Sequence, residues 1–328
     1  MGSDMSGIID VHMHCFTGQA YAPAVLSNIE KLRQAGVRHL AVAGLINTKL
    51  DSDSMWGLIP DFVENRGDPL FNEVGNLLKF TGLSDQMIVP LVDTRHLWGN
   101  VPIVLNSYLR QGFKGIKGIY LPDKNNDLGV RGVPDTFNIS LKQYRQREWE
   151  IFSFAQDHDL PLLYHMDARR YGDEMIALLD DFPRVRVDFA HLGLSRKAFS
   201  KILDRYPAVY ADIAGLLPHI RNNPQSYRDF ILHYPDRICF GSDAFLYQAE
   251  TVLDYINVVK DLRLPEEIEV QVFNRNPAGF LGPAVPGEST DQPTWCADII
   301  TVRTMYDHKG FESECRGVKY AGENEVGL

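Results

Sequence analysis

The strongest constraint on the fold is a regular alternation of short apolar runs, rich in β-branched residues, with longer segments of helical spacing. Eight runs occur, at residues 7–14, 38–46, 87–94, 112–121, 160–166, 184–191, 208–214 and 237–243. Helical spacing occurs between or after them at 22–35, 141–157, 173–181, 195–206, 226–233 and 249–261. Strands that alternate with helices form parallel sheets. Eight such units predict an α/β fold, a (β/α)8 TIM-type barrel.

Three segments depart from the minimal strand–helix unit. Residues 47–86 are a long insertion after the second strand, which we expect over the barrel mouth as a lid or as extra helices on the rim. The polar stretch 123–137 predicts a second mouth loop. Periodicity ends after Leu281 in a stretch rich in Gly and Pro. We therefore expect a barrel over 7–282 and, over 283–328, a C-terminal extension that is not an independent domain.

Charge and composition exclude several classes of partner. A net charge of −10 repels nucleic acid and anionic lipid surfaces. The sequence contains no apolar run of the about 18 residues that a membrane span needs, and its N-terminus has no signal-type segment. The four cysteines lie far apart without a CxxC pair, which argues against disulfides and a thiolate zinc site. We expect a cytoplasmic protein with a small-molecule substrate; a homo-oligomer is compatible with the sequence.

The end of the first strand carries Asp10, His12 and His14 at alternate positions. Alternate strand residues point to the same face, so we expect these three side chains to project into the barrel. Paired imidazoles suit Zn, Fe or a similar ion, and a nearby carboxylate can orient a ligand ring. The alternative is that His-x-His occurs by chance on a solvated strand. The residues at the other strand ends help to decide between these two interpretations.

Three further strands end in the same way, with His165, His191 and Asp243 closing the fifth, sixth and eighth strands. Polar residues at the C-terminal ends of barrel strands usually belong to an active site. Together with the two histidines of the first strand they predict a metal centre. Asp243 could instead cap the helix that follows it.

The order His-x-His, His, His, Asp resembles the amidohydrolase superfamily, especially the branch called amidohydrolase 2. Supporting phrases are Gly-Phe-Lys-Gly-Ile-Lys at 112–117, Phe-Ala-His-Leu-Gly at 189–193, Phe-Gly-Ser-Asp at 240–243 and Phe-Asn-Arg-Asn-Pro-Ala at 273–278. The similarity covers about residues 7–282. The resemblance implies one or two divalent ions, Zn, Fe or Mn, with His12, His14, His165 and His191 as ligands and Asp243 as a ligand or general base.

Lys117 occupies the position at which some members of the superfamily carry a carboxylated lysine that bridges two metal ions. Carboxylation requires a neutral amine, and therefore a desolvated site. Other members hold a single metal and leave this position to the substrate. The resemblance therefore leaves a binuclear centre with carboxylated Lys117 and a mononuclear centre both open.

Charged residues at or just after the ends of the third, fifth and seventh strands are candidates for substrate binding. They are Arg95, His96, Asp167, Arg169 and Asp212. A guanidinium group can clamp a carboxylate or phosphate through two hydrogen bonds. The seventh-strand aspartate could instead support a metal ligand.

The resemblance implies a metal-dependent hydrolase in which the ion activates water and polarises a carbonyl, while Asp243 accepts and returns a proton. An amide, ester, lactone or thioester bond of a small, conceivably anionic, substrate fits this chemistry. A metal-dependent, non-oxidative decarboxylase of a small carboxylic acid is the alternative. A barrel without catalysis is disfavoured because every expected type of ligand is retained.

Overall fold

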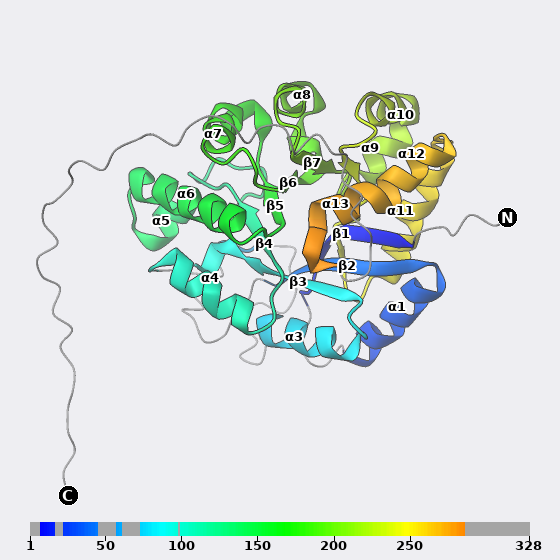
Figure 1. The fold of residues 1–328 in the computed structure, drawn as a ribbon, viewed down its shortest axis with the longest axis horizontal. Helices are drawn as coiled ribbons and strands as arrows, with labels where there is room; N and C mark the ends of the chain where they lie inside the picture. The colour runs from blue at the N-terminus through cyan, green and yellow to red at the C-terminus, as the bar shows by residue number, and fades with distance from the viewer. Residues whose placement is uncertain (1–6, 17–21, 45–56, 61–72, 98, 286–328) are drawn as a thin grey trace, which may run out of the picture. The chain divides into compact units, whose positions relative to one another are not determined.

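The computed structural model describes residues 7–16, 22–44, 57–60, 73–97 and 99–285, with the side chain of His96 excepted. Within these ranges, nine parallel strands form one sheet in the order β8-β7-β6-β5-β4-β3-β2-β1-β9 (Figure 1). The strands are β1 Ile8–His14, β2 Val37–Gly44, β3 Ile88–Asp93, β4 Gly115–Ile119, β5 Leu162–His165, β6 Val187–Phe189, β7 Val209–Asp212, β8 Ile238–Cys239 and β9 Ala244–Phe245. Each of the eight predicted runs overlaps a strand, and β9 directly follows the last run.

The eighth strand closes the barrel by changing partner part of the way along. β8 pairs with β7, whereas β9, which follows after residues 240–243, pairs with β1. Between the two pairings, the N–H of Val11 donates to the carbonyl of Phe240 at 3.0 Å, and the N–H of Asp243 donates to the carbonyl of His12 at 2.8 Å. The fold is the predicted (β/α)8 barrel.

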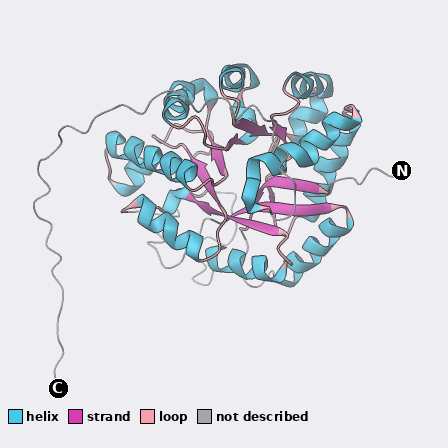
Figure 2. Cartoon of the chain, in the orientation of Figure 1, coloured by secondary structure: helices cyan, strands magenta, loops and turns pink. Residues whose placement is uncertain are grey.

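Helices surround the strands (Figure 2). They are α1 Ala22–Gln34, α3 Glu73–Leu83, α4 Val101–Arg110, α5 Val133–Phe137, α6 Leu141–Asp157, α7 Ala168–Asp181, α8 Arg196–Arg205, α9 Leu217–Asn222, α10 Pro224–His233, α11 Ala249–Asp261, α12 Glu266–Val270 and α13 Asn276–Leu281, with shorter turns η2 Thr94–His96, η3 Ala190–Leu194, η4 Gln271–Arg275 and η5 Gly282–Ala284. Local features of the sequence explain why α6 and α8 form. The start of α6 is fixed by a capping box between Ser140 and Gln143, and α8 buries Phe199, Ile202 and Leu203 at helical spacing.

The apolar core has two layers. The larger lies between the strands and the helices. The smaller fills the barrel and joins Ile9, Leu91 and Leu163 to Phe280 and Leu281 of α13. This contact brings α13 (orange in Figure 1) against the strands from inside the ring.

Two asparagines attach the α13 region to the beginnings of strands. Asn274 donates through Nδ2 to the carbonyl of Gly7 at 2.7 Å, directly before β1. Asn276 donates to the carbonyl of Ile238 at 2.8 Å, at the start of β8. α13 therefore closes the barrel at the N-terminal ends of the strands and leaves the C-terminal ends for the site.

The expected appendages are only partly described. Within the predicted insertion 47–86, α3 packs on β2 and β3 and is the regular helix of the second unit. Apart from residues 57–60, the stretch before α3 lies outside the described residues, as does the predicted extension beyond Val285. Among the described residues, the search for a helix of the length and apolarity needed to cross a bilayer finds none.

Candidate metal centre

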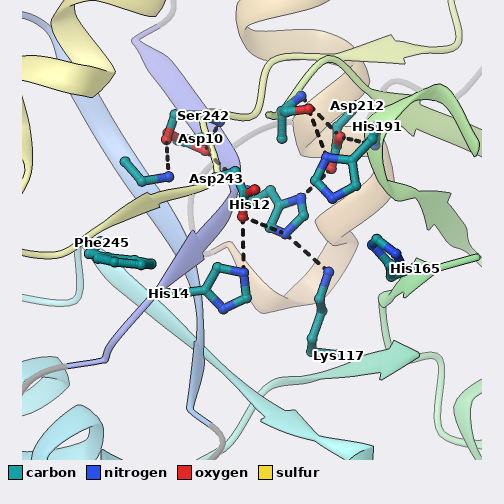
Figure 3. Close-up of polar contacts among 12 residues, drawn as sticks. Asp10, His12, His14, Lys117, His165, His191, Asp212, Ser242, Asp243 and Phe245 are labelled. Carbon is teal, nitrogen blue, oxygen red and sulfur yellow. Dashed lines mark hydrogen bonds and ion pairs between the residues drawn. The ribbon is translucent and has the colours of Figure 1, made fainter. Parts of the chain in front are cut away.

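Side chains from six different strand ends meet at the end of the barrel opposite α13. Figure 3 shows His12 and His14 of β1 facing Asp243, with Lys117 of β4 below His12, and His191 and Asp212 above it and to the right. His165 of β5 lies to one side of this group. The predicted residues from the ends of β1, β4, β5, β6, β7 and β8 are thus brought together.

His12, His14 and Asp243 form the tightest set of potential metal ligands. Oδ1 of Asp243 lies 3.1 Å from Nε2 of His14 and 3.5 Å from Nε2 of His12. One donor atom from each residue falls within 4.8 Å of the other two. Two ring nitrogens and one carboxylate oxygen so placed are a donor set that Zn, Fe or Mn accepts.

The ionisation of this set also suits a cation. Burial lowers the pKa of His12 to about 3 and also lowers the pKa of His14, so both rings are neutral and carry a free lone pair. Burial acts to raise the pKa of Asp243, but its interactions with the rings of His12 and His14 hold it well below its ordinary value. The site therefore combines neutral imidazoles with an ionised carboxylate.

Asp10 does not lie with the histidine rings, in contrast to the expectation from simple strand alternation. The pairing of β1 with β2 shifts register between Asp10 and Met13. Oδ1 of Asp10 accepts the backbone N–H of His12 at 3.0 Å and that of Ser242 at 3.1 Å. Its burial raises its pKa to about 7. Asp10 thus ties β1 to the end of the eighth strand and does not orient a ring.

Asp212 performs the orienting role expected of Asp10. Its Oδ2 accepts a hydrogen bond from Nδ1 of His12 at 2.7 Å, and its Oδ1 accepts the backbone N–H groups of His191 at 2.7 Å and Ala214 at 3.1 Å. Burial acts to raise its pKa, but His12 and the other partners lower it, so Asp212 is an acceptor only. A proton held on Nδ1 of His12 leaves Nε2 free to face Asp243 and Lys117.

His191 follows β6 in a left-handed backbone conformation, with φ of 57°. Its Nδ1 lies 2.7 Å from the carbonyl of Ala214, which fixes Nδ1 as the donor and leaves Nε2 with the lone pair. Gly215 makes room for this ring. A Cβ at Gly215 would lie 3.0 Å from Nδ1 of His191 and 3.3 Å from Oδ2 of Asp243.

Lys117 occupies the middle of the site. Its side chain projects from β4, the residue is 3% exposed, and Nζ lies 3.0 Å from Nε2 of His12. Burial lowers the pKa of the ammonium group, although Asp212 and Asp243 oppose this shift. Lys117 therefore shares the nitrogen that His12 would offer to a metal ion.

His165 is near the other rings but differs from them in its partner. The centroid of its ring lies 5.1 Å from that of His191. Its Nε2 lies 2.9 Å from Oδ2 of Asp127, a residue of the loop between β4 and α5. The sequence identified this loop as polar but did not single out Asp127. Nothing in the sequence pairs Asp127 with a histidine 38 positions later.

The two predicted arginines already have carboxylate partners. Arg95 donates through Nε and Nη2 to both oxygens of Asp93, at 3.0 and 2.8 Å. Arg169, with a side chain 60% exposed, does the same with Asp167 at 2.9 and 2.8 Å. In the sequence, an aspartate stands two residues before each arginine, and this spacing could have indicated the two ion pairs. His96 was also predicted, but its side chain lies outside the described residues.

Solved structures with low sequence identity share the fold. An uncharacterised TIM-barrel protein from Bordetella bronchiseptica matches with a TM-score of 0.56 and 15% identity, over 84% of this chain and 99% of that chain. A structure from the engineering of organophosphate hydrolysis on a promiscuous lactonase template gives 0.53 and 12%, over 85% and 96%. A dihydroorotase from Saccharomyces cerevisiae, in complex with 5-fluoroorotic acid, gives 0.52 and 14%, over 85% and 84%.

Comparison with curated protein sequences gives no significant match. A family model described as amidohydrolase matches residues 110–282. The matched region is more than half of the chain and contains Lys117, His165, His191, Asp212 and Asp243. The match agrees with the fold of the solved structures. The chain belongs to the amidohydrolase family of hydrolytic enzymes.

Proposed function

We propose that this enzyme is a metal-dependent hydrolase that cleaves an amide, ester, lactone or thioester bond of a small organic substrate with water. The observation that carries the proposal is the convergence of His12, His14 and Asp243 at the barrel mouth. Their donor atoms are close enough for one ion, and their ionisation suits a cation. The proposal assigns them to a Zn, Fe or Mn ion.

The remaining polar residues have a place in the same proposal. His191 and His165 would hold a second ion beside the first, and Lys117 would bridge the two as a carbamate. The reaction of its neutral amine with carbon dioxide forms a C–N bond and releases a proton. Burial supports this reaction because it lowers the pKa of the amine.

When bound, the metal lowers the pKa of water and polarises the scissile carbonyl. The protein's own residues would then handle the protons and hold the geometry. Asp243, whose side chain is 34% exposed at the mouth, accepts the proton of the attacking water and passes it to the leaving group. Asp212 and the carbonyl of Ala214 hold His12 and His191 so that each ring presents Nε2.

Hydrolysis is favoured over decarboxylation by the state of the arginines. A decarboxylase of a small acid needs cations to hold the carboxylate of its substrate. Arg95 and Arg169 are both engaged in two-point ion pairs with neighbouring aspartates. Releasing either one would break a two-point ion pair, which is costly where the carboxylate is buried, as that of Asp93 is.

Metal analysis and a substrate panel test the proposal together. We expect His12→Ala and His14→Ala to lose bound metal and turnover while the barrel stays folded, because the ligands lie at the mouth. Asp243→Asn should keep at least one ion but lose most turnover, since an amide cannot accept the proton. His219→Ala, an exposed histidine of α9, is the matched control. Full metal occupancy in both β1 variants would contradict the assignment.

Lys117 decides between two metals and one. Lys117→Ala should reduce the metal content from about two equivalents to one or fewer, and a short carboxylic acid should partly restore activity by filling the bridge. Lys117→Arg should not restore it, because guanidinium cannot react with carbon dioxide in protonated form. If Lys117→Ala keeps its metal and only raises KM for an anionic substrate, the lysine is a substrate anchor and decarboxylation gains support.

A further inference from the structure

A second carboxylate–histidine pair lies at the rim of the site, between Asp127 and His165. Oδ2 of Asp127 is 2.9 Å from Nε2 of His165. The arrangement parallels the buried pair of Asp212 and His12, in which a carboxylate oxygen lies 2.7 Å from a ring nitrogen. The two pairs engage opposite nitrogens of their rings, Nδ1 in His12 and Nε2 in His165.

The loop that carries Asp127 is fixed by its neighbour Asn126. The side-chain amide of Asn126 donates to the carbonyls of Asp123 at 3.0 Å and Val130 at 2.8 Å, and its oxygen accepts the N–H groups of Leu128 and Val130. Gly132 allows the chain to return close to Asp123, because a Cβ there would lie 2.7 Å from the backbone of that residue. Asp127 is thus presented by an ordered turn whose own bonds do not involve the Asp127 side chain.

The chemistry of the contact determines which ring nitrogen carries the proton. A carboxylate oxygen accepts hydrogen bonds and has no proton to donate, so the 2.9 Å contact between Oδ2 of Asp127 and Nε2 of His165 needs a proton on the ring nitrogen. A neutral imidazole carries one proton, on one of its two ring nitrogens. The N–H must therefore be on Nε2, and the lone pair on Nδ1.

We propose that Asp127 is a positioning residue that fixes His165 in its Nε2–H form, so that His165 offers Nδ1 to the metal centre while His12 and His191 offer Nε2. The role of His165 as a ligand rests on the proposed function. The position of its proton does not, because the contact with Asp127 is made within the protein alone. Asp127 acts on the site by orienting His165, and this role needs no contact with the substrate.

The first test reads the ring proton directly in metal-free protein. Nitrogen-15 NMR of labelled histidine distinguishes a protonated ring nitrogen from one with a lone pair. We expect His165 of the wild type to be protonated at Nε2 alone, and Asp127→Ala to give a mixture of the two neutral forms. Asn125→Ala, at an exposed residue of the same loop, is the matched control and should keep the wild-type signals. A wild-type pattern in Asp127→Ala, or protonation of Nδ1 in the wild type, would overturn the proposal.

The second test measures metal affinity by calorimetric titration with Zn²⁺. Partners that orient a ligand ring typically contribute 10–100-fold in affinity, so Asp127→Ala should bind the ion at the His165 position about 10–100-fold more weakly. The control Asn125→Ala should bind as the wild type does; an equal loss there would attribute the effect to the loop and contradict the positioning role. If Asp127→Ala keeps both the affinity and the ring signals but loses kcat/KM, Asp127 contacts substrate and the proposal is wrong.

The two tests separate the two hypotheses. If wild-type protein binds no Zn²⁺, the proposed function fails, while the NMR result still decides the role of Asp127. If Zn²⁺ binds normally and the nitrogen-15 signals of His165 are the same in Asp127→Ala as in the wild type, the positioning role is wrong. The hydrolase proposal is then unaffected. The fold is not at risk in these variants, since the side chain of Asp127 is 30% exposed.

Discussion

Replacement of Asp212 by asparagine tests how the site holds its central histidine. The carboxylate accepts three hydrogen bonds, from Nδ1 of His12 and from the N–H groups of His191 and Ala214. In Asp212→Asn, the amide oxygen can keep both backbone bonds. The amino group then replaces Oδ2 and meets the Nδ1–H of His12, and two donors cannot bond to each other.

The magnitude follows from this one lost bond. A hydrogen bond to a charged group contributes about 1.5–3 kcal/mol, which is the expected loss in the free energy of unfolding of metal-free protein. His12 can recover the bond only by moving its proton to Nε2, which removes the lone pair that would bind metal. We therefore expect metal affinity to fall about 10–100-fold, equivalent to about 1.4–2.8 kcal/mol.

Urea unfolding of metal-free protein and calorimetric metal titration measure the two effects separately. Asp236→Asn, at an aspartate with a side chain 69% exposed, is the matched control and should change neither quantity. Wild-type metal affinity in a folded Asp212→Asn variant would refute the argument that Asp212 fixes the proton on Nδ1 of His12. A large loss of stability without a loss of affinity would assign Asp212 to the fold alone.

Three further changes probe other parts of the molecule. Phe280→Ala should lower the free energy of unfolding by about 3–5 kcal/mol, because the ring is fully buried in the barrel floor, and should leave the metal content of the folded protein unchanged; urea unfolding and elemental analysis check this. Gly215→Ala should cost about 1–2 kcal/mol through its φ of +65° and should also weaken metal binding, since the new Cβ would crowd His191; titration of Zn²⁺ measures the second effect. Asp10→Asn should change the pH dependence of stability. Because the folded pKa of Asp10, about 7, lies above the unfolded 3.8, wild type loses about 1.4 kcal/mol of stability for each pH unit as the pH rises from 5 to 7, and the variant lacks this loss. Urea unfolding of both metal-free proteins at pH 5, 6, 7 and 8 checks this, and a constant difference between them would contradict it.

The fold was largely predictable because its signals are local. Hydrophobic spacing and turn residues located β1 to β8, and the bounds of α6 and α11 agree with the predicted ranges. The eighth strand was harder, since its change of partner depends on residues that are distant in the sequence. Asp243 has a φ of 61°, which breaks the strand at that point, and aspartate carries only a weak preference for that conformation.

The site was predictable in its residue types but not in its pairings. Strand ends identified the histidines and Asp243, and their roles as metal ligands stay predictions. The partners of Arg95 and Arg169 could have been read from the aspartates two residues earlier. In contrast, the partner of His165 comes from a loop, where no periodicity places a side chain. Asp10 likewise bonds to the backbone N–H groups of His12 and Ser242, which no sequence pattern indicated.

The two-residue strand β9 gives the barrel a seam that an ion would reinforce. β9 pairs with β1 only at Met13 and His14, and residues 240–243 beside it supply Asp243. An ion held by Asp243 and His14 would therefore connect the last strand to the first. A ligand that binds only the closed form stabilises it in proportion to the logarithm of its concentration. Amide hydrogen exchange between β1 and β9 should accordingly slow as metal is added. The rate of local opening of the barrel then reports the occupancy of the metal site.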